Sequence, residues 1–63
     1  MNGKGKEISM ETTLYSKHVS YGTVKLTDAG PVSPRYRIYV NGQLKEYSDN
    51  LYGLKDIFDR RYY

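Results

Sequence analysis

The chain of 63 residues allows one small domain, which would bury only about 60% of the surface that its unfolded form exposes. It has no cysteine, which excludes a disulfide framework and a thiolate metal site, and no apolar run approaches the ~20 residues of a membrane span. Ten Lys and Arg against seven Asp and Glu give a net charge of +3, which is less basic than dedicated DNA-packaging proteins and favours an anionic partner only mildly.

Eight tyrosines supplement a small set of aliphatic residues. A tyrosine ring is large and apolar with a polar tip, so some of these rings complete the core while others can face a partner. The sequence does not show which of the eight tyrosines are buried and which are exposed. The first ten residues lack the apolar core of a signal peptide, and together with the absence of cysteine this predicts a soluble, cytoplasmic protein.

Residues 1–6 are mostly Gly and Lys and show no periodicity, which predicts a flexible basic N-terminal tail. The two lysines of this tail could touch phosphates, but they lack the spacing of a P-loop. The remainder, residues 7–63, is predicted to form a single domain.

Between residues 7 and 27, apolar and polar side chains alternate with period two in two runs, as expected for antiparallel strands. The turn between the runs is predicted within VSYGT, where Gly22 can take the positive φ that a hairpin needs. The register of this hairpin stays open, and Lys17, His18 and Tyr21 could face either side of the sheet. The alternating residues are Ile8, Met10, Thr12 and Leu14 in the first strand, and Val24 and Leu26 in the second.

The segment DAGPVSPR, residues 28–35, must end the second strand. Pro31 and Pro34 lack a backbone N–H donor and restrict φ, and Gly30 favours a turn. A third strand then begins near Arg35. An Asn-Gly pair at 41–42 between two β-prone runs predicts a second hairpin.

Two registers are open for this second hairpin. A two-residue turn would pair Val40 with Gln43 and give faces of mixed polarity, whereas a three-residue loop with Gly42 in a bulge would pair Ile38 with Leu44. We favour the three-residue loop, because the face that must be buried decides between registers one residue apart. It groups Tyr36, Ile38 and Leu44 on the buried face and leaves Arg35, Arg37, Tyr39, Lys45 and Tyr47 on a basic, aromatic outward face.

After Tyr47 the periodicity becomes helical. Ser48, Asp49 and Asn50 are all suitable N-cap residues, and basic residues near the end of the chain suit the negative end of a helix dipole. Gly53 would cost the helix about 1 kcal/mol relative to Ala, which predicts either close packing on the sheet or a loose start. The apolar residues at helical spacing are Leu51, Leu54, Ile57, Phe58 and Tyr62.

The predicted fold is therefore α+β, with the order β-β-β-β-α. A small antiparallel sheet of three to four strands, with a hairpin turn at Asn41-Gly42, carries one C-terminal α-helix packed on one face.

The sequence favours a non-enzymatic protein with no cofactor, no metal site and no catalytic residues. His18 is the only histidine, and no motif places a serine, carboxylate or lysine beside it. Nucleotide-binding motifs and calcium-loop spacing are both absent. On the helix, Lys55 with Asp59 and Asp56 with Arg60 are spaced for i,i+4 ion pairs on a solvated surface.

Interleaved basic and aromatic residues instead predict a binding surface. Lys and Arg bind phosphates, and exposed rings stack on bases in nucleic-acid-binding sheets. The same residue types dominate protein–protein hot spots, so a host protein is the alternative partner. The candidate binding residues are Arg35, Arg37, Tyr39, Lys45 and Tyr47 on the sheet, and Arg60, Arg61 and Tyr63 at the end of the chain.

Two resemblances bear on this choice. The order of strand, turn and helix from Tyr36 to Tyr62 is similar to that of the small DNA-binding domains at the start of some tyrosine recombinases, whose sheet enters the major groove. A short, cysteine-free, tyrosine-rich chain also resembles the accessory proteins of bacteriophages and mobile elements, which include inhibitors of the anti-CRISPR type.

The first resemblance implies a nucleic-acid-binding module, and the second implies an inhibitor or adaptor that occludes a host protein. No membrane partner is expected. An unpaired strand at the sheet edge could also build a homodimer.

Overall fold

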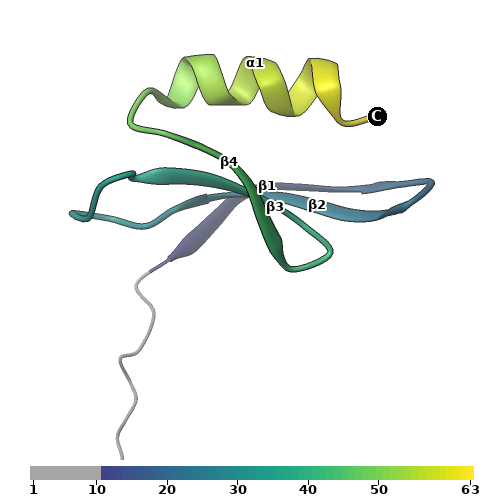
Figure 1. Ribbon diagram of the computed structural model, residues 1–63, viewed down its shortest axis with the longest axis horizontal. Coiled ribbons are helices and arrows are strands. Elements are labelled where there is room, and N and C mark those ends of the chain that lie inside the picture. Colours follow the sequence, from purple (N-terminus) through teal and green to yellow (C-terminus); the bar gives the residue numbers. More distant parts are fainter. Residues whose placement is uncertain (1–10) are drawn as a thin grey trace, which may run out of the picture.

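The computed structural model describes residues 11–63, which form a four-stranded antiparallel sheet with one helix across one face (Figure 1). This confirms the predicted α+β fold and its C-terminal helix. The predicted basic tail, together with Ile8 and Met10, lies outside the described residues. The elements are β1 (Thr12–Val19), β2 (Gly22–Asp28), β3 (Tyr36–Val40), β4 (Gln43–Ser48) and α1 (Leu51–Arg61), and the strands lie in the order β1-β2-β3-β4.

The core lies between α1 and the sheet face that α1 covers. Alternate residues of the two central strands point into it, because successive side chains of a strand face opposite sides. The helix contributes residues one turn apart to the same layer. The buried members of this core are Val24 and Leu26 of β2, Ile38 and Val40 of β3, and Leu54 and Phe58 of α1.

The register of the second hairpin differs from the one we favoured. Val40 pairs with Gln43 across a two-residue turn in which Asn41 and Gly42 both have positive φ, 52° and 84°. A bulge between Ile38 and Tyr39 on the ladder then shifts the pairing. The three-residue loop was therefore wrong, because Asn-Gly adopts the two positive φ angles of a tight turn easily and the extra residue is absorbed further along β4.

The bulge determines which side chains share a face. Tyr39 pairs with Leu44, which is 46% exposed, and Ile38 pairs with Glu46. The prediction that Leu44 lies in the core was therefore wrong. Lys45 is the extra residue and has no cross-strand partner. Burial of Leu44 is not required, because Leu54 and Phe58 of the helix already cover Ile38.

The first hairpin turns where predicted. Val19 pairs with Gly22, and Gly22 has a φ of 144°. Its register places Lys17 opposite Val24, on the helix side, and His18 opposite Thr23, on the other side. A second bulge between Thr13 and Tyr15 leaves Leu14 exposed at 38% and turns Tyr15 toward the helix, where its ring lies 6.1 Å from that of Phe58.

Helix α1 is capped at both ends by side chains. Asn50 is the N-cap, and its Oδ1 accepts a hydrogen bond from the Gly53 amide at 3.2 Å. At the other end, Lys17 of β1 donates its ammonium to the Phe58 carbonyl at 2.5 Å and lies over the Phe58 ring. Gly53 is exposed and does not pack on the sheet, which excludes the first explanation that we offered for it.

Candidate nucleic-acid interface

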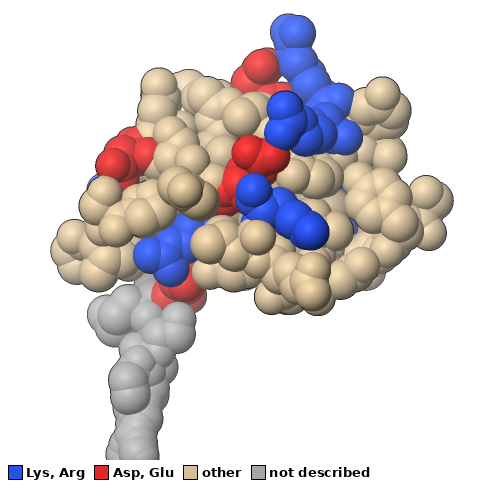
Figure 2. Space-filling view, in the orientation of Figure 1, with Lys and Arg blue, Asp and Glu red and all other residues tan. Residues whose placement is uncertain are grey.

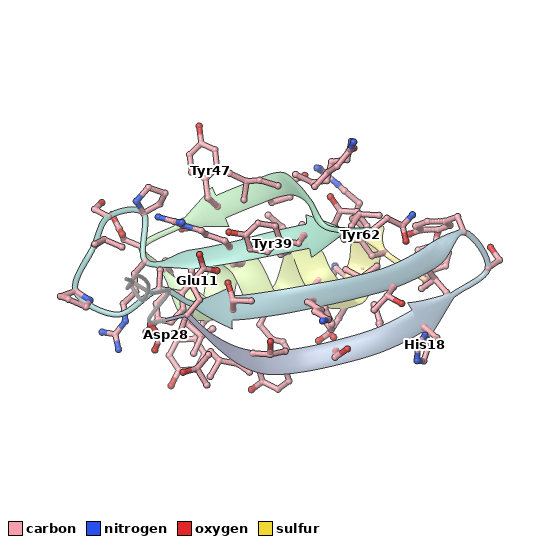
Figure 3. The ribbon with its side chains drawn as sticks, turned by 90° about the horizontal axis from the view of Figure 1, so that it is seen from below. Glu11, His18, Asp28, Tyr39, Tyr47 and Tyr62 are labelled. Atoms are coloured by element: carbon pink, nitrogen blue, oxygen red, sulfur yellow. The ribbon has the colours of Figure 1, made fainter. Side chains whose placement is uncertain are left out.

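The sheet face that points away from α1 is uncovered, and we call it the open face. Figure 3 views this face with the helix behind the sheet. Its residues follow from the strand register, since partners across a ladder share a face. They are Thr13, Ser16 and His18 of β1, Thr23, Lys25 and Thr27 of β2, Arg37 and Tyr39 of β3, and Leu44 and Tyr47 of β4.

The charged residues of the open face are unevenly distributed by sign. None of the four described strands contributes an acidic residue to it, because Asp28 and Glu46 lie on the helix side of β2 and β4. Lys25 is exposed there and makes no ion pair within residues 11–63. The strands therefore supply cations, hydroxyls and aromatic rings to this face.

Three of the predicted binding residues meet on the open face. Arg37 and Tyr47 are direct cross-strand partners, and Tyr39 follows Arg37 by two residues on β3. The Tyr47 ring is 62% exposed, so a large apolar surface faces solvent beside a guanidinium group. These are three of the five residues that the sequence predicted for the outward face, the other two being Arg35 and Lys45.

Arg35, at the end of the 28–35 loop, forms an ion pair with Asp28. Its Nε and Nη2 donate to the two Asp28 carboxylate oxygens at 2.8 and 3.0 Å. The hydrogen bond from Arg35, followed by one from the Gly30 amide, lowers the pKa of Asp28. Lys45, the bulge residue, is exposed and makes no ion pair within the described chain.

Of the predicted C-terminal residues, Arg60 and Arg61 lie on α1 and Tyr63 follows the helix, across the sheet from the open face. Arg60 pairs with Asp56 at 2.8 Å, and Arg61 pairs with Glu46 of β4. On the side drawn in Figure 2, basic side chains lie beside acidic ones and do not form a continuous basic patch. The predicted residues thus divide between two surfaces.

Tyr63 belongs to this second surface. Its ring is 84% exposed, and it borders a hollow of about 490 Å³ with Ile57, Arg60 and Arg61 of the helix. The adjacent Tyr62 is partly buried and donates its hydroxyl to Glu46 at 3.2 Å. Burial, reinforced by the Glu46 carboxylate, raises the pKa of Tyr62.

The sequence interpretation missed a hollow on the open face near the second turn. Its volume is about 440 Å³, and it is lined by Thr23, Lys25, Tyr39, Asn41 and Gly42. Lys25 and Tyr39 are cross-strand partners, so both side chains project from neighbouring strands toward the same hollow. The pairing of β2 with β3 spans a long loop, and no local pattern in the sequence reveals it.

Glu11 also went unnoticed, and it is the centre of a hydrogen-bonded cluster on the open face (Figure 3). Its Oε1 accepts from the Thr27 hydroxyl at 2.8 Å, and its Oε2 accepts from Arg37 Nη1 at 3.2 Å and from the Tyr39 hydroxyl at 3.1 Å. The pKa of Arg37 is raised, mainly by its interaction with the Tyr39 side chain and to a smaller extent by the Glu11 carboxylate. Arg37 also donates its Nε to the Pro34 carbonyl at 3.1 Å.

Within residues 11–63, no group of three or more His, Asp or Glu side chains lies close enough to hold a metal ion. The described part of the chain also contains no helix with the length and apolar character needed to cross a bilayer. No protein-family model, curated protein or solved structure matches this chain at a significant level.

Proposed function

We propose that this chain is a non-enzymatic nucleic-acid-binding module that uses the open face of its sheet. The observation that carries the proposal is that one face presents the exposed Lys25, the ring of its cross-strand partner Tyr39 and the exposed ring of Tyr47, and that no described strand contributes an acidic residue to this face. Lys and Arg neutralise phosphates, and exposed tyrosines offer stacking surfaces worth about 1–3 kcal/mol per base in single strands.

The geometry of the face suits this use. A two-layer domain with its helix on one side presents the other side of its sheet to a groove or to an extended strand. The hydroxyls of Thr13, Ser16 and Thr23 lie on the same face, and hydroxyl groups can donate to phosphate oxygens. The similarity in element order to the recombinase domains supports the same proposal. We propose separately that the protein acts in the cytoplasm.

A second candidate function rests on the helix side. Tyr52 and Tyr63 are 87% and 84% exposed, and Arg60 and Arg61 lie beside Tyr63 around the hollow on α1. Tyr and Arg are enriched in protein–protein hot spots. This surface would serve an inhibitor or adaptor of the phage or mobile-element type that binds a host protein, and the edge strands β1 and β4 would allow a homodimer.

The primary test is fluorescence anisotropy with labelled single-stranded and duplex oligonucleotides. Each neutralised phosphate should weaken duplex binding about 3.5-fold between 50 and 200 mM salt, so two or more contacts give roughly a tenfold loss. Lys25→Glu should weaken binding about tenfold or more at the lower salt. Lys25 is preferred to Arg37 for this test, because Arg37 also holds Glu11 and Pro34 in the folded sheet.

Arg60→Glu is the matched control. It makes the same change of charge on the far side of the molecule, where Arg60 has Asp56 as its ion-pair partner within residues 11–63, on the exposed helix surface. Equal losses from both variants would indicate a response to net charge alone and would contradict the assignment of the open face. Absence of binding at the lower salt would reject the nucleic-acid proposal and leave the helix side as the candidate surface.

A further inference from the structure

We propose that Thr27, Arg37 and Tyr39 form an anion site on the open face that the chain's own Glu11 occupies, and that a backbone phosphate of a nucleic acid displaces this carboxylate. The inference rests on the proposed function, because it assigns one phosphate subsite to the open face. Glu11 then acts as an internal competitor that lowers the affinity of the resting protein.

Donors from two strands converge at this site. Three side chains from two different strands direct a hydroxyl, a guanidinium and a phenol to one carboxylate, over distances of 2.8 to 3.2 Å. Thr27 and Arg37 are direct cross-strand partners, and Tyr39 follows two residues later, so the donors are held by the sheet itself. The sheet register, and not Glu11, therefore fixes the backbone positions of the three donor residues.

The carboxylate that occupies the site resembles a phosphate in its charge and its acceptor oxygens. A carboxylate presents two oxygens with a shared negative charge, as the two non-bridging oxygens of a phosphodiester do. Here Oε1 takes the Thr27 donor, and Oε2 takes the donors from Arg37 and Tyr39. Arg is well suited to phosphate, and the bond from its Nε to the Pro34 carbonyl holds the guanidinium in place.

The site lies next to the hollow on the open face. The pair Thr27–Arg37 is followed two residues along the ladder by the pair Lys25–Tyr39, which lines the hollow. Two residues of a strand span about 7 Å, close to the separation of neighbouring phosphates along a nucleic-acid strand. One phosphate at the anion site would place the next one near Lys25.

Glu11 lies outside the paired strands. Glu11 precedes β1, and the first pair of the β1–β2 ladder is Thr12 with Asp28. Its carboxylate can therefore be displaced without breaking a strand pair. The affinity of the resting protein is reduced by the fraction of molecules in which Glu11 occupies the site.

The test compares Glu11→Gln with the wild-type chain in the anisotropy assay. Glu11→Gln should bind oligonucleotides roughly tenfold more tightly, and its salt dependence should steepen by about one phosphate contact. Asp56→Asn is the matched control, since it removes the same charge from the helix surface. Glu11→Ala checks that the gain comes from loss of the carboxylate, and circular dichroism confirms that each variant is folded.

A second readout keeps the anion site separable from the proposed function. Glu11→Gln is titrated with dimethyl phosphate, at constant ionic strength in sodium chloride, while the NMR signals of Arg37 Nε–Hε and the Thr27 amide are followed. A saturable shift of both signals, absent or weaker in the wild-type chain, supports the site. Its absence overturns the site, whatever the oligonucleotides do.

Equal oligonucleotide affinity of Glu11→Gln and the wild-type chain would overturn the internal competition while the proposed function stands. If neither protein binds oligonucleotides, the proposed function fails, and the phosphate titration alone decides whether the anion site exists.

Discussion

Asn41 joins the two hairpin turns at one end of the sheet. Its backbone amide donates to the Thr23 carbonyl at 2.9 Å, its Nδ2 donates to the Tyr21 carbonyl at 3.0 Å, and its Oδ1 accepts from the Thr23 amide at 3.1 Å. The side chain lies against Gly22, where a Cβ atom would stand 1.9 Å from the Asn41 Oδ1. Gly22 is therefore required both for its positive φ and for its lack of a side chain.

A matched pair of substitutions tests this point. Gly22→Ala should lower the free energy of unfolding by more than about 1 kcal/mol, because the φ of 144° is strained for alanine and the new methyl meets Asn41. Gly53→Ala should raise it by up to about 1 kcal/mol, because Gly53 is helical and exposed, and its nearest neighbour would be 3.7 Å away.

Urea denaturation of the two variants gives both values. The same chemical change is made at each position, so the opposite signs isolate the backbone conformation. A loss of stability in both variants would contradict the conformation assigned to Gly53.

At the scale of elements, two carboxylates hold the 28–35 loop against its neighbours. Asp28, at the end of β2, accepts from Arg35 and from the Gly30 amide. Asp49, between β4 and α1, accepts from the Ser33 hydroxyl at 2.9 Å and from the Arg35 amide at 2.8 Å. The loop thereby links the strand before it to the segment that leads into the helix.

The Asp28 contact predicts a dependence of stability on acid pH. Because its pKa is lowered in the folded state, Asp28 contributes stability above the unfolded pKa, and this is lost as pH falls through the folded pKa. The difference in thermal midpoint between the wild-type chain and Asp28→Asn should therefore be largest near neutral pH and shrink below about pH 4. Thermal unfolding between about pH 7 and pH 2 measures this difference.

Asp56→Asn controls for the change in net charge, since it removes a carboxylate from the helix surface. A constant difference between wild type and Asp28→Asn across the whole pH range would show that the ionised Asp28 carboxylate makes no specific contribution through Arg35.

At the scale of the whole molecule, the two exposed aromatic surfaces lie on opposite sides of the sheet. Tyr47 is on the open face with Arg37, whereas Tyr63 lies beyond the end of α1. Salt bridges on the helix side satisfy both Arg60 and Arg61. The sides therefore differ in what they can offer a partner, although both present tyrosine and arginine.

Truncation of one tyrosine on each side tests which surface binds. Tyr47→Ala should weaken single-stranded oligonucleotide binding by roughly 1–3 kcal/mol, because a stacking surface is lost, and Tyr63→Ala should leave it unchanged. Anisotropy at fixed salt measures both variants. A loss caused by Tyr63→Ala alone would move the binding surface to the helix side.

Local patterns were sufficient for the elements themselves. The turn residues Gly22 and Asn41-Gly42, the loop with its two prolines and the polar cap before α1 were all identified from neighbours in the chain, and the structure confirms their places. The two i,i+4 ion pairs of the helix are confirmed for the same reason.

Pairings between distant segments were not available from such patterns. Leu44 was expected in the core because the sequence offers no information on what else covers Ile38. Glu46 was not expected beside Ile38, because the residues that bind the Glu46 carboxylate, Arg61 and Tyr62, lie fifteen and sixteen residues away in the chain. The Glu11 cluster joins residues up to 28 positions apart.

The sequence by itself therefore determined the number, type and order of the elements, since turn chemistry, capping and hydrophobic period act over a few residues. Only the tertiary structure decided the strand register, the two bulges and the composition of the open face. These depend on which side α1 covers and on contacts such as that of Glu11 with Arg37, whose energies depend on atoms brought together by the whole fold.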